Sequence, residues 1–232
     1  MNGVAIYGHW GRPVLAFPSE RADASEFERR GMVGAVGDLI DAGRAKLYCV
    51  DSFDRESWSN DAIPLEERAQ RHSVYEEWIL REVVPFVQFD SGGTHELIAC
   101  GASMGAYHAA NFALKRADLF PLAICMSGSY DPSGWNGWGE RGDATYFNNP
   151  MDYVAHLEGD HLAWLRNRLS MLLVCGQGQW EDTTGALDST RSLAALLQSK
   201  EIRCELDLWG HDVAHDWPSW RAQLAHHLPR FV

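Results

Sequence analysis

The sequence lacks the features that mark a partner of nucleic acid or of a membrane. Basic residues are scarce, with 20 Lys and Arg against 32 Asp and Glu, and the formal net charge is −12. Nucleic acid requires clusters of basic side chains for its phosphates, and an anionic membrane repels a protein of this charge. No apolar run approaches the length of a transmembrane helix. Neither partner is therefore expected.

A disulfide framework and a secretory leader are also missing. The five cysteines form no C-x-x-C pair, and each lies in or at the end of an apolar run, as small buried hydrophobic residues do. The N-terminal MNGVAIYGHWGRP has no charged start and no long apolar stretch, so no signal peptide is expected. An odd number of cysteines without metal-binding spacing fits a reducing compartment, and we expect a cytoplasmic protein.

Metal and cofactor motifs are absent as well. His211 and His215 are four residues apart in HDVAHD, but the preceding strand and Pro218 argue against the helix that would bring them together. The other histidine and acidic residues do not follow a metal-binding spacing, and no glycine-rich nucleotide-binding pattern follows a strand. We expect no metal and no cofactor.

Apolar strands alternate with amphipathic helices along most of the chain, whose 232 residues suffice for a single domain, 1–232. Strands are expected at residues 4–7, 14–17, 45–50, 96–100, 122–126, 171–175 and 204–208. Helices are expected from Glu26 or Arg30 to Ala42, from Pro64 to about Val84, and at 106–116, 150–157, 161–168, 187–199 and 217–228. This alternation predicts an α/β fold with a mostly parallel sheet and helices on both faces.

The stretch ELIACGASMGAYHAA, residues 96–110, combines a buried strand, a sharp turn and a small-residue helix around Ser103. It contains G-x-S-x-G in the strand–turn–helix context of a nucleophile elbow. Gly101 and Gly105 allow strand and helix to pack closely around a strained serine, and the free N–H groups of the helix N-terminus favour developing negative charge. We interpret Ser103 as a nucleophile.

A serine nucleophile needs a histidine base and an acid that orients the base, and the order expected after such an elbow is Ser, acid, His. His211 and His215 both follow the last strand. We favour His215, because Asp216 and Pro218 begin a helix directly behind it. His211 is the alternative, and whichever of the two is not the base is interpreted as a loop histidine bonded to backbone.

The acid is expected in GQGQWEDTTG, the loop after residues 171–175. Glu181 and Asp182 compete for the role, and Asp188 is a weaker candidate because it falls within the next helix. We favour Asp182, with Glu181 as a solvated charge or a carboxylate near a helix N-terminus.

The oxyanion formed on attack needs two backbone N–H donors, one just after the nucleophile and one from the loop after an early strand. The first is the N–H of Met104. The second must come from the loop Pro18-Ser19-Glu20-Arg21, in which Pro18 has no N–H. We favour Glu20, whose carboxylate would then have to point away from the developing anion.

Tryptophan is abundant, with ten residues in the chain. Trp135, Trp138 and Trp180 fall in loops at the expected active edge of the sheet, and Trp58 is a further candidate. Residues 130–149, which hold two of them, form a long loop of the kind that usually serves a function. Two interpretations stay open: aromatic walls for an apolar or aromatic acyl group, or packing of the loop onto the body.

These motifs resemble the α/β-hydrolase superfamily, and within it the putative-esterase (esterase D-like) family, which also contains feruloyl esterases, enterochelin esterases and mycolyltransferases. The resemblance covers nearly the whole chain and rests on GASMGAYHA, MSGSYD, CGQGQWED and HDWPSWR. It implies the α/β-hydrolase fold with a small cap at residues 130–168, and it gives the roles of base, acid and second oxyanion donor to His215, Asp182 and Glu20. The chain departs from the family's His-Gly or Asp-Gly signature, since it reads Phe-Pro-Ser-Glu.

The combined expectation is a serine carboxylic-ester hydrolase that acts on a small-molecule ester through an acyl-enzyme intermediate. An acyltransferase on the same triad and a non-catalytic binding protein of this fold are the alternatives. The sequence does not decide whether the chain forms a homo-oligomer.

Overall fold

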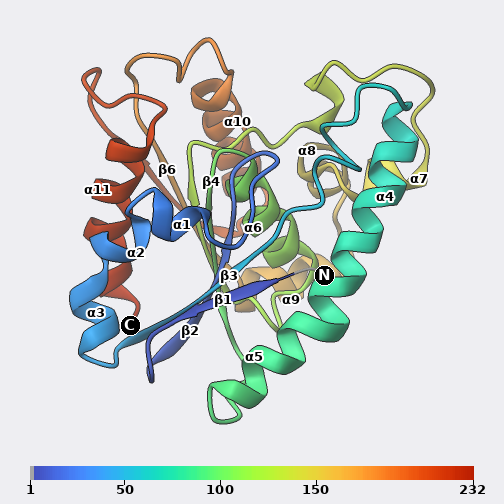
Figure 1. The fold of residues 1–232 in the computed structure, drawn as a ribbon. Helices are drawn as coiled ribbons and strands as arrows, with labels where there is room; N and C mark the ends of the chain where they lie inside the picture. Colours follow the sequence, from blue (N-terminus) through green and yellow to red (C-terminus); the bar gives the residue numbers. More distant parts are fainter. Residues whose placement is uncertain (1–2) are drawn as a thin grey trace.

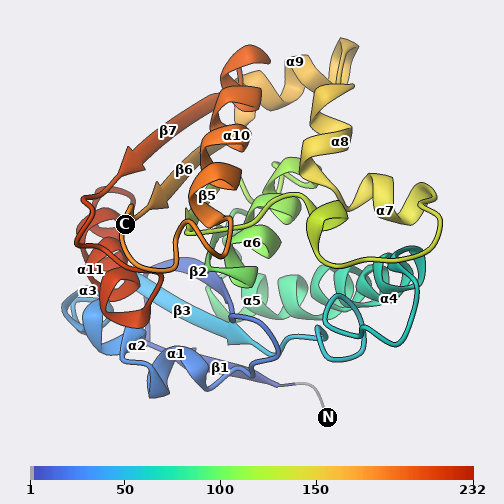
Figure 2. The same cartoon turned by 90° about the horizontal axis from the view of Figure 1, so that it is seen from above.

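A seven-stranded sheet forms the centre of the computed structural model, which describes residues 3–232 (Figures 1 and 2). The strand order is β1-β3-β2-β4-β5-β6-β7, and every neighbouring pair is parallel except β1 and β3. The strands are β1 (Val4–Tyr7), β2 (Arg12–Phe17), β3 (Ala45–Val50), β4 (Ile98–Ala102), β5 (Leu122–Met126), β6 (Ser170–Cys175) and β7 (Arg203–Leu208). The expected mostly parallel sheet is confirmed, and β4, which leads into Ser103, lies in its middle.

Helices cover both faces of the sheet in two groups, seen on opposite sides of the strands in Figure 2. The smaller group comprises α1 (Glu26–Arg29), α2 (Met32–Ala35), α3 (Gly37–Asp41) and α11 (Trp217–His227). The larger group comprises α4 (Leu65–Trp78), α5 (Val84–Asp90), α6 (Met104–Lys115), α7 (Asp143–Phe147), α8 (Pro150–Ala155), α9 (Gly159–Arg168) and α10 (Ala186–Ser199). Alternate residues of β2 follow this division, with Val14 in the core of the first group and Leu15 in that of the second. No helix within residues 3–232 is long and apolar enough to cross a membrane.

The first helical region is broken where a single helix to Ala42 was expected. Gly31 adopts a left-handed φ of 75°, and Val36 has a non-helical φ of −119°. Three short helices therefore replace one long helix. The breaks let the chain follow the sheet, because Phe27, Met32 and Leu39 from all three pieces are buried against it. Sequence periodicity does not reveal breaks that tertiary packing imposes.

The second long helix continues past Val84, where it was expected to end. A π-helical turn at Ile79–Val83 joins α4 to α5, which runs to Asp90. Pro85 lies in the first turn of α5 and cannot donate a backbone hydrogen bond. The change of hydrogen-bond pattern just before it lets the chain remain helical through the proline.

The long loop after β5 contains α7, a helix that the sequence did not suggest. Glu66 of α4 binds its N-terminus: the carboxylate accepts from the backbone N–H of Gly142, Ala144 and Thr145 at 2.8–3.0 Å and from the Thr145 hydroxyl at 2.7 Å. Burial alone would raise the pKa of Glu66, but these hydrogen bonds outweigh it and lower the pKa to about 2. A carboxylate 76 or more residues away in sequence thus fixes the cap segment.

Replacing Glu66 with Gln should lower the free energy of unfolding at pH 7 by about 1–2 kcal/mol, because the partner of four donors loses its charge. Because the pKa of Glu66 is lowered, this stabilisation is fully present above the ordinary glutamate pKa of 4.5 and is lost as the pH falls toward about 2. Urea unfolding at several pH values measures the gap, that is, the difference in free energy of unfolding between the native protein and Glu66→Gln. Glu67→Gln, which breaks only an exposed pair with Arg71, is the matched control. Equal losses in the two variants, or a gap that widens in acid, would contradict the assignment.

Candidate active site

The turn between β4 and α6 holds Ser103 in a strained conformation. Its φ of 55° and ψ of −120° lie outside the regions that residues with a side chain ordinarily adopt. Strand and helix approach so closely that a Cβ on Gly101 would lie 2.2 Å from the carbonyl oxygen of Gly105, and a Cβ on Gly105 would lie 2.3 Å from that of Phe17. Both positions therefore require glycine, and the geometry is that of the elbow the motif predicts.

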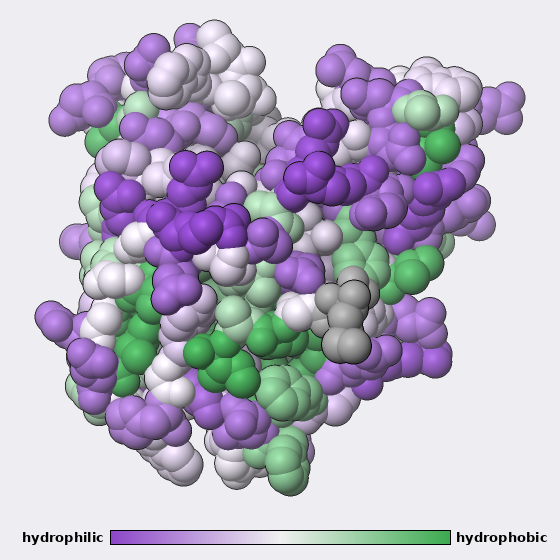
Figure 3. All heavy atoms as spheres, viewed as in Figure 1, coloured by the Kyte–Doolittle hydropathy of each residue, from purple (hydrophilic) through white to green (hydrophobic). Residues whose placement is uncertain are grey.

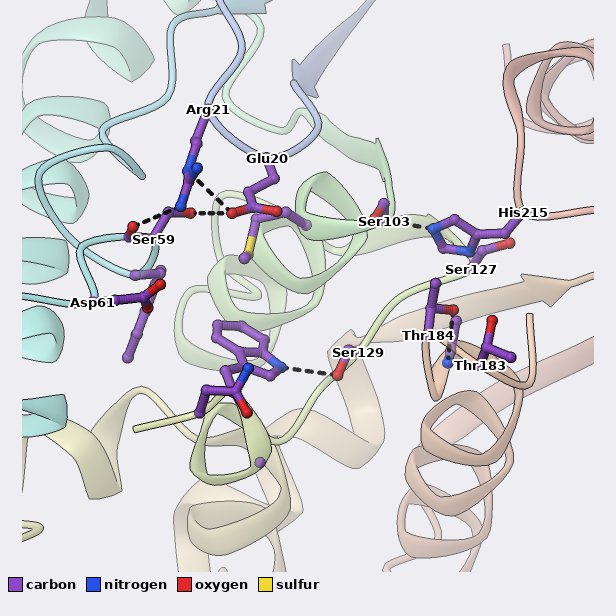
Figure 4. Close-up of a pocket in the computed structure, with 16 residues that line it drawn as sticks. Glu20, Arg21, Ser59, Asp61, Ser103, Ser127, Ser129, Thr183, Thr184 and His215 are labelled. Carbon is purple, nitrogen blue, oxygen red and sulfur yellow. Dashed lines mark hydrogen bonds and ion pairs between the residues drawn. The ribbon is translucent and has the colours of Figure 1, made fainter. Parts of the chain in front are cut away.

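A chain of hydrogen bonds links Ser103, His215 and Glu181. The Oγ atom of Ser103 lies 3.2 Å from Nε2 of His215, and Nδ1 of the same ring lies 2.9 Å from Oε2 of Glu181. An ionised carboxylate can only accept, so Nδ1–H donates to Glu181 and Nε2 is free to accept from the serine hydroxyl. Figure 4 shows the imidazole turned toward Ser103. Asp216 caps α11 behind His215 by accepting from the N–H of Ser219 at 3.0 Å.

The structure corrects the acid: Glu181, not Asp182, faces His215. Asp182 is exposed, and its carboxylate accepts from the N–H of Thr183 at 2.8 Å. The reason lies in the loop after β6, where Gly178 packs so closely that a Cβ would lie 2.6 Å from the Val213 carbonyl oxygen. The loop is thereby held against the segment before His215, and Glu181 is the carboxylate that turns inward. Asp188, the third candidate, is also exposed.

Glu181 is fully buried and receives hydrogen bonds from several sides. Oε1 accepts from the Ser127 hydroxyl at 2.5 Å and from the N–H of Gly176 at 3.3 Å, and Oε2 lies 3.4 Å from the Cys175 thiol. Burial, followed by the charge of Glu181, raises the pKa of Cys175 to about 12, so the thiol stays protonated near neutral pH. These three groups surround the carboxylate and fix its orientation.

Ser127, a polar residue expected at the carboxyl end of its strand, is supported by Trp220, which was not identified from the sequence. The Trp220 indole N–H donates to the Ser127 hydroxyl at 3.1 Å, and its ring packs edge-on against His215 with centroids 4.9 Å apart. Ser127 is buried with a φ of 51°. The segments MSGSYD and HDWPSWR stood out in the sequence, but only the fold shows that they meet.

His211, the alternative base, lies outside this network. Its side chain is exposed and its Nδ1 lies 3.2 Å from the carbonyl oxygen of Gln177. This is the backbone-bonded loop histidine that the sequence analysis gave as the other interpretation.

The loop after β2 leaves one N–H unpaired beside the serine. Glu26 accepts from the N–H of Ser19 at 2.8 Å, and Asp54 accepts from the N–H of Arg21 at 3.3 Å, whereas the N–H of Glu20 has no acceptor within residues 3–232. The Glu20 carboxylate points away, toward the Ser59 hydroxyl at 2.6 Å (Figure 4). Met104, the first residue of α6, has no intrahelical acceptor for its N–H either.

These groups open into a cavity of about 510 Å³ at the carboxyl edge of the sheet. Figure 3 shows the same edge as a notch between two lobes whose rims are mostly hydrophilic. The cavity is lined by Glu20, Arg21, Trp58, Ser59, Asp61, Ser103, Met104, Ser127, Ser129, Gly134, Trp135, Asn136, Thr183, Thr184, Ala186 and His215. Polar side chains dominate, and within residues 3–232 no group of three or more His, Cys, Asp or Glu could hold a metal ion.

The tryptophans divide between the two interpretations. Trp135 and Trp58 line the cavity, where their rings meet edge-to-face at 5.4 Å and Trp135 donates to the Ser129 hydroxyl at 2.9 Å. Trp138 and Trp180 do not line it and are 53% and 50% exposed. The aromatic wall is therefore confined to one side of the cavity.

A serine at a nucleophile elbow in the middle of this sheet, followed along the chain by a buried acid and a histidine, defines an α/β-hydrolase. The particular family follows from the sequence match, because the model of the family described as "Putative esterase" matches residues 23–231. The chain belongs to this family and is a carboxylic ester hydrolase. No curated protein matches it significantly.

Several solved structures share the whole fold. A ferulic acid esterase superposes with a TM-score of 0.75 at 16% identity, covering 99% of this chain and 91% of the other. MPT51 of Mycobacterium tuberculosis gives 0.74 at 16% identity, with the same coverage. An S-formylglutathione hydrolase from Agrobacterium tumefaciens gives 0.71 at 15% identity, covering 99% and 88%. At such identities the likeness concerns the fold.

Replacing Gly105 with Ala should lower the free energy of unfolding by about 3 kcal/mol, the upper end for overpacking, because the new methyl group would meet backbone rather than a movable side chain. Gly34→Ala in α2 is the control, since a Cβ there has no atom within 4 Å. That variant should be neutral or stabilising by up to about 1 kcal/mol. Urea unfolding compares them, and similar values for both would show that the contact at the elbow is not tight.

Proposed function

We propose that the protein hydrolyses small carboxylic esters with a Ser103–His215–Glu181 triad, through an acyl-enzyme intermediate. The unbroken hydrogen-bond chain from the Ser103 hydroxyl through both ring nitrogens of His215 to Glu181 carries the proposal. The side chain of His215 is only 12% exposed and that of Glu181 is fully buried, so water competes little for these hydrogen bonds.

Ser103 Oγ attacks the acyl carbon while its proton passes to Nε2 of His215. The negative charge that develops on the carbonyl oxygen is bound by the N–H groups of Met104 and Glu20. The protonated imidazole then gives its proton to the leaving oxygen as the ester C–O bond breaks. Water, deprotonated by His215, attacks the acyl carbon and releases the carboxylic acid and Ser103.

The acid acts by orientation and charge. Glu181 holds Nδ1–H of His215, which keeps Nε2 available as the base, and its negative charge stabilises the imidazolium formed in each step. The donors from Ser127 and Gly176 leave the carboxylate little freedom to rotate away. An acid that stays fixed while the imidazole gains and loses a proton suits both halves of the reaction.

The cavity favours short or polar acyl and alcohol groups. Serine, threonine, asparagine and charged side chains form most of its lining, with Trp58 and Trp135 together on one side. A long alkyl chain would displace water from these polar groups without replacing their hydrogen bonds. Turnover of p-nitrophenyl esters should therefore be highest for acetate or its near homologues.

The triad is tested with p-nitrophenyl acetate. Ser103→Ala, His215→Ala and Glu181→Gln should each lower kcat by about 10³-fold or more, because removing any member of such a unit leaves little of its function. Asp182→Asn and His211→Ala are matched controls, one residue and four residues from the proposed acid and base, and both should keep activity within about twofold. Circular dichroism confirms that each variant is folded.

A loss with Asp182→Asn rather than Glu181→Gln would overturn the assignment of the acid. If Ser103→Ala keeps full turnover, or if a fluorophosphonate fails to label Ser103 in the native protein, the esterase mechanism falls and a non-catalytic role takes its place. Adding an alcohol acceptor and analysing the products separates transfer from hydrolysis.

A further inference from the structure

A buried carboxylate, Asp54, connects the two segments that carry the proposed oxyanion donors. It lies in the loop after β3 and is 1% exposed. Its Oδ2 accepts from the N–H of Arg21, the residue after Glu20, at 3.3 Å. Its Oδ1 lies 3.0 Å from Nε2 of His108, one helical turn after Met104 in α6. Asp54 thus contacts Arg21, which follows Glu20, and His108, which lies one helical turn after Met104.

The loop on one side of Asp54 does not hold its shape by itself. Arg21 has a φ of 60°, in the left-handed region, which is unfavourable for a residue with a side chain. The segment lies outside helix and strand, so no ladder of backbone bonds fixes it. One turn bond, from the N–H of Ala22 to the carbonyl oxygen of Ser19 at 3.3 Å, spans the loop, and the N–H groups of Ser19 and Arg21 are held by the carboxylates of Glu26 and Asp54. Between them, the direction of the Glu20 N–H is determined.

The partner on the other side of Asp54 is rigid. His108 is fully buried in α6, and its Nδ1 has no acceptor within residues 3–232. Nε2 is the ring nitrogen that faces the carboxylate and Nδ1 has no partner, so we assign the ring hydrogen to Nε2, where it donates to Asp54. His72 stacks on the same ring with centroids 5.2 Å apart, and burial lowers the pKa of His72 well below its usual range, so it adds no charge. The histidine is a fixed donor on the helix that begins at the elbow.

We propose that Asp54 is a positioning residue that sets the spacing between the Glu20 and Met104 N–H groups, and that His108 is its anchor. The inference rests on the proposed function. Asp54 does not touch the reacting atoms: it acts on the transition state through Arg21 and His108. Its loss should let the β2 loop relax, so that the Glu20 N–H no longer lies at the position of the oxyanion.

Asp54→Ala should lower kcat for p-nitrophenyl acetate by about 10- to 100-fold with little change in KM, because an oxyanion donor acts mainly in the transition state. A structural defect could also lower kcat, so a second readout is needed. The thionoester analogue, in which sulfur replaces the carbonyl oxygen, supplies it. Sulfur accepts hydrogen bonds weakly, and its turnover therefore depends little on the two donors.

The measured quantity is the kcat/KM ratio of the oxygen ester to the thionoester. It is a property of each folded molecule, so a fraction of unfolded enzyme cancels. We expect Asp54→Ala to reduce the ratio by on the order of tenfold. Asp54→Asn should reduce it less, since its carbonyl oxygen can still accept from Arg21 while its amide would force His108 to place a hydrogen on the unpaired Nδ1.

Asp51→Asn is the matched control. Asp51 lies three residues earlier in the same loop, and its carboxylate also accepts from two backbone N–H groups, those of Gly3 at 2.6 Å and Ala24 at 2.8 Å. Its side chain accepts no hydrogen bond from Arg21 or from α6, and it does not line the active-site cavity. Its loss should lower stability and leave the ratio unchanged.

An unchanged ratio in the folded Asp54 variants would overturn the proposal, as would an equal fall in Asp51→Asn. Should Asp54→Ala not fold, Asp54→Asn alone decides by the same criterion. A failure of the proposed function is separate, because it would appear as full activity in Ser103→Ala or as the absence of fluorophosphonate labelling in the native protein. If Ser103 is labelled and required for activity but the ratio is unchanged in the Asp54 variants, only the proposed role of Asp54 is wrong.

Discussion

The close approach of β2, β4 and α6 is the constraint on which the rest of the site depends. Gly105 lies so near the end of β2 that no side chain fits between its Cα and the carbonyl oxygen of Phe17. This contact holds the start of α6 beside the loop that follows β2. The strained turn at Ser103 goes with the close approach of Gly101 and Gly105, and the approach of Gly105 to Phe17 places the loop that contains Glu20 next to that turn. An elbow packed less tightly would present the serine but separate it from Glu20, the proposed second oxyanion donor.

At the carboxyl edge, side-chain carboxylates bind backbone N–H groups that have no partner in a helix or a strand. Glu26 and Asp54 hold N–H groups of the β2 loop, and Glu66 holds the N-terminus of α7. Glu181 works in the same way on the Gly176 N–H while it also holds His215. Part of the acidic excess of the chain thus serves as internal acceptors for loop backbone, which composition alone would assign to solubility.

Sequence reasoning succeeded where the information is local. The strands at residues 45–50 and 122–126 have the bounds expected from their apolar runs, because a fully buried parallel strand is a continuous apolar segment. The elbow and the position of His215 follow from short motifs with a steric meaning. Sequence reasoning failed at Asp182. Which of the two adjacent acids turns inward depends on how Gly178 packs on Val213, a contact between residues 35 positions apart. Ser127–Trp220, Glu66–α7 and Asp54–His108 were missed for the same reason.

Burying an acidic side chain near the active site has a desolvation cost, and Glu26 shows it. Burial raises the pKa of Glu26 above its usual value even though Ser19 donates to it twice, which means that desolvation outweighs these two hydrogen bonds. By the linkage between pKa and stability, ionising Glu26 therefore costs more in the folded protein than in the unfolded chain. Through its two hydrogen bonds with Ser19, Glu26 holds the loop beside the nucleophile in spite of this desolvation. The site is assembled from such elements: a strained serine, a strained Arg21 and a desolvated acid, each held by the well-packed sheet beneath them.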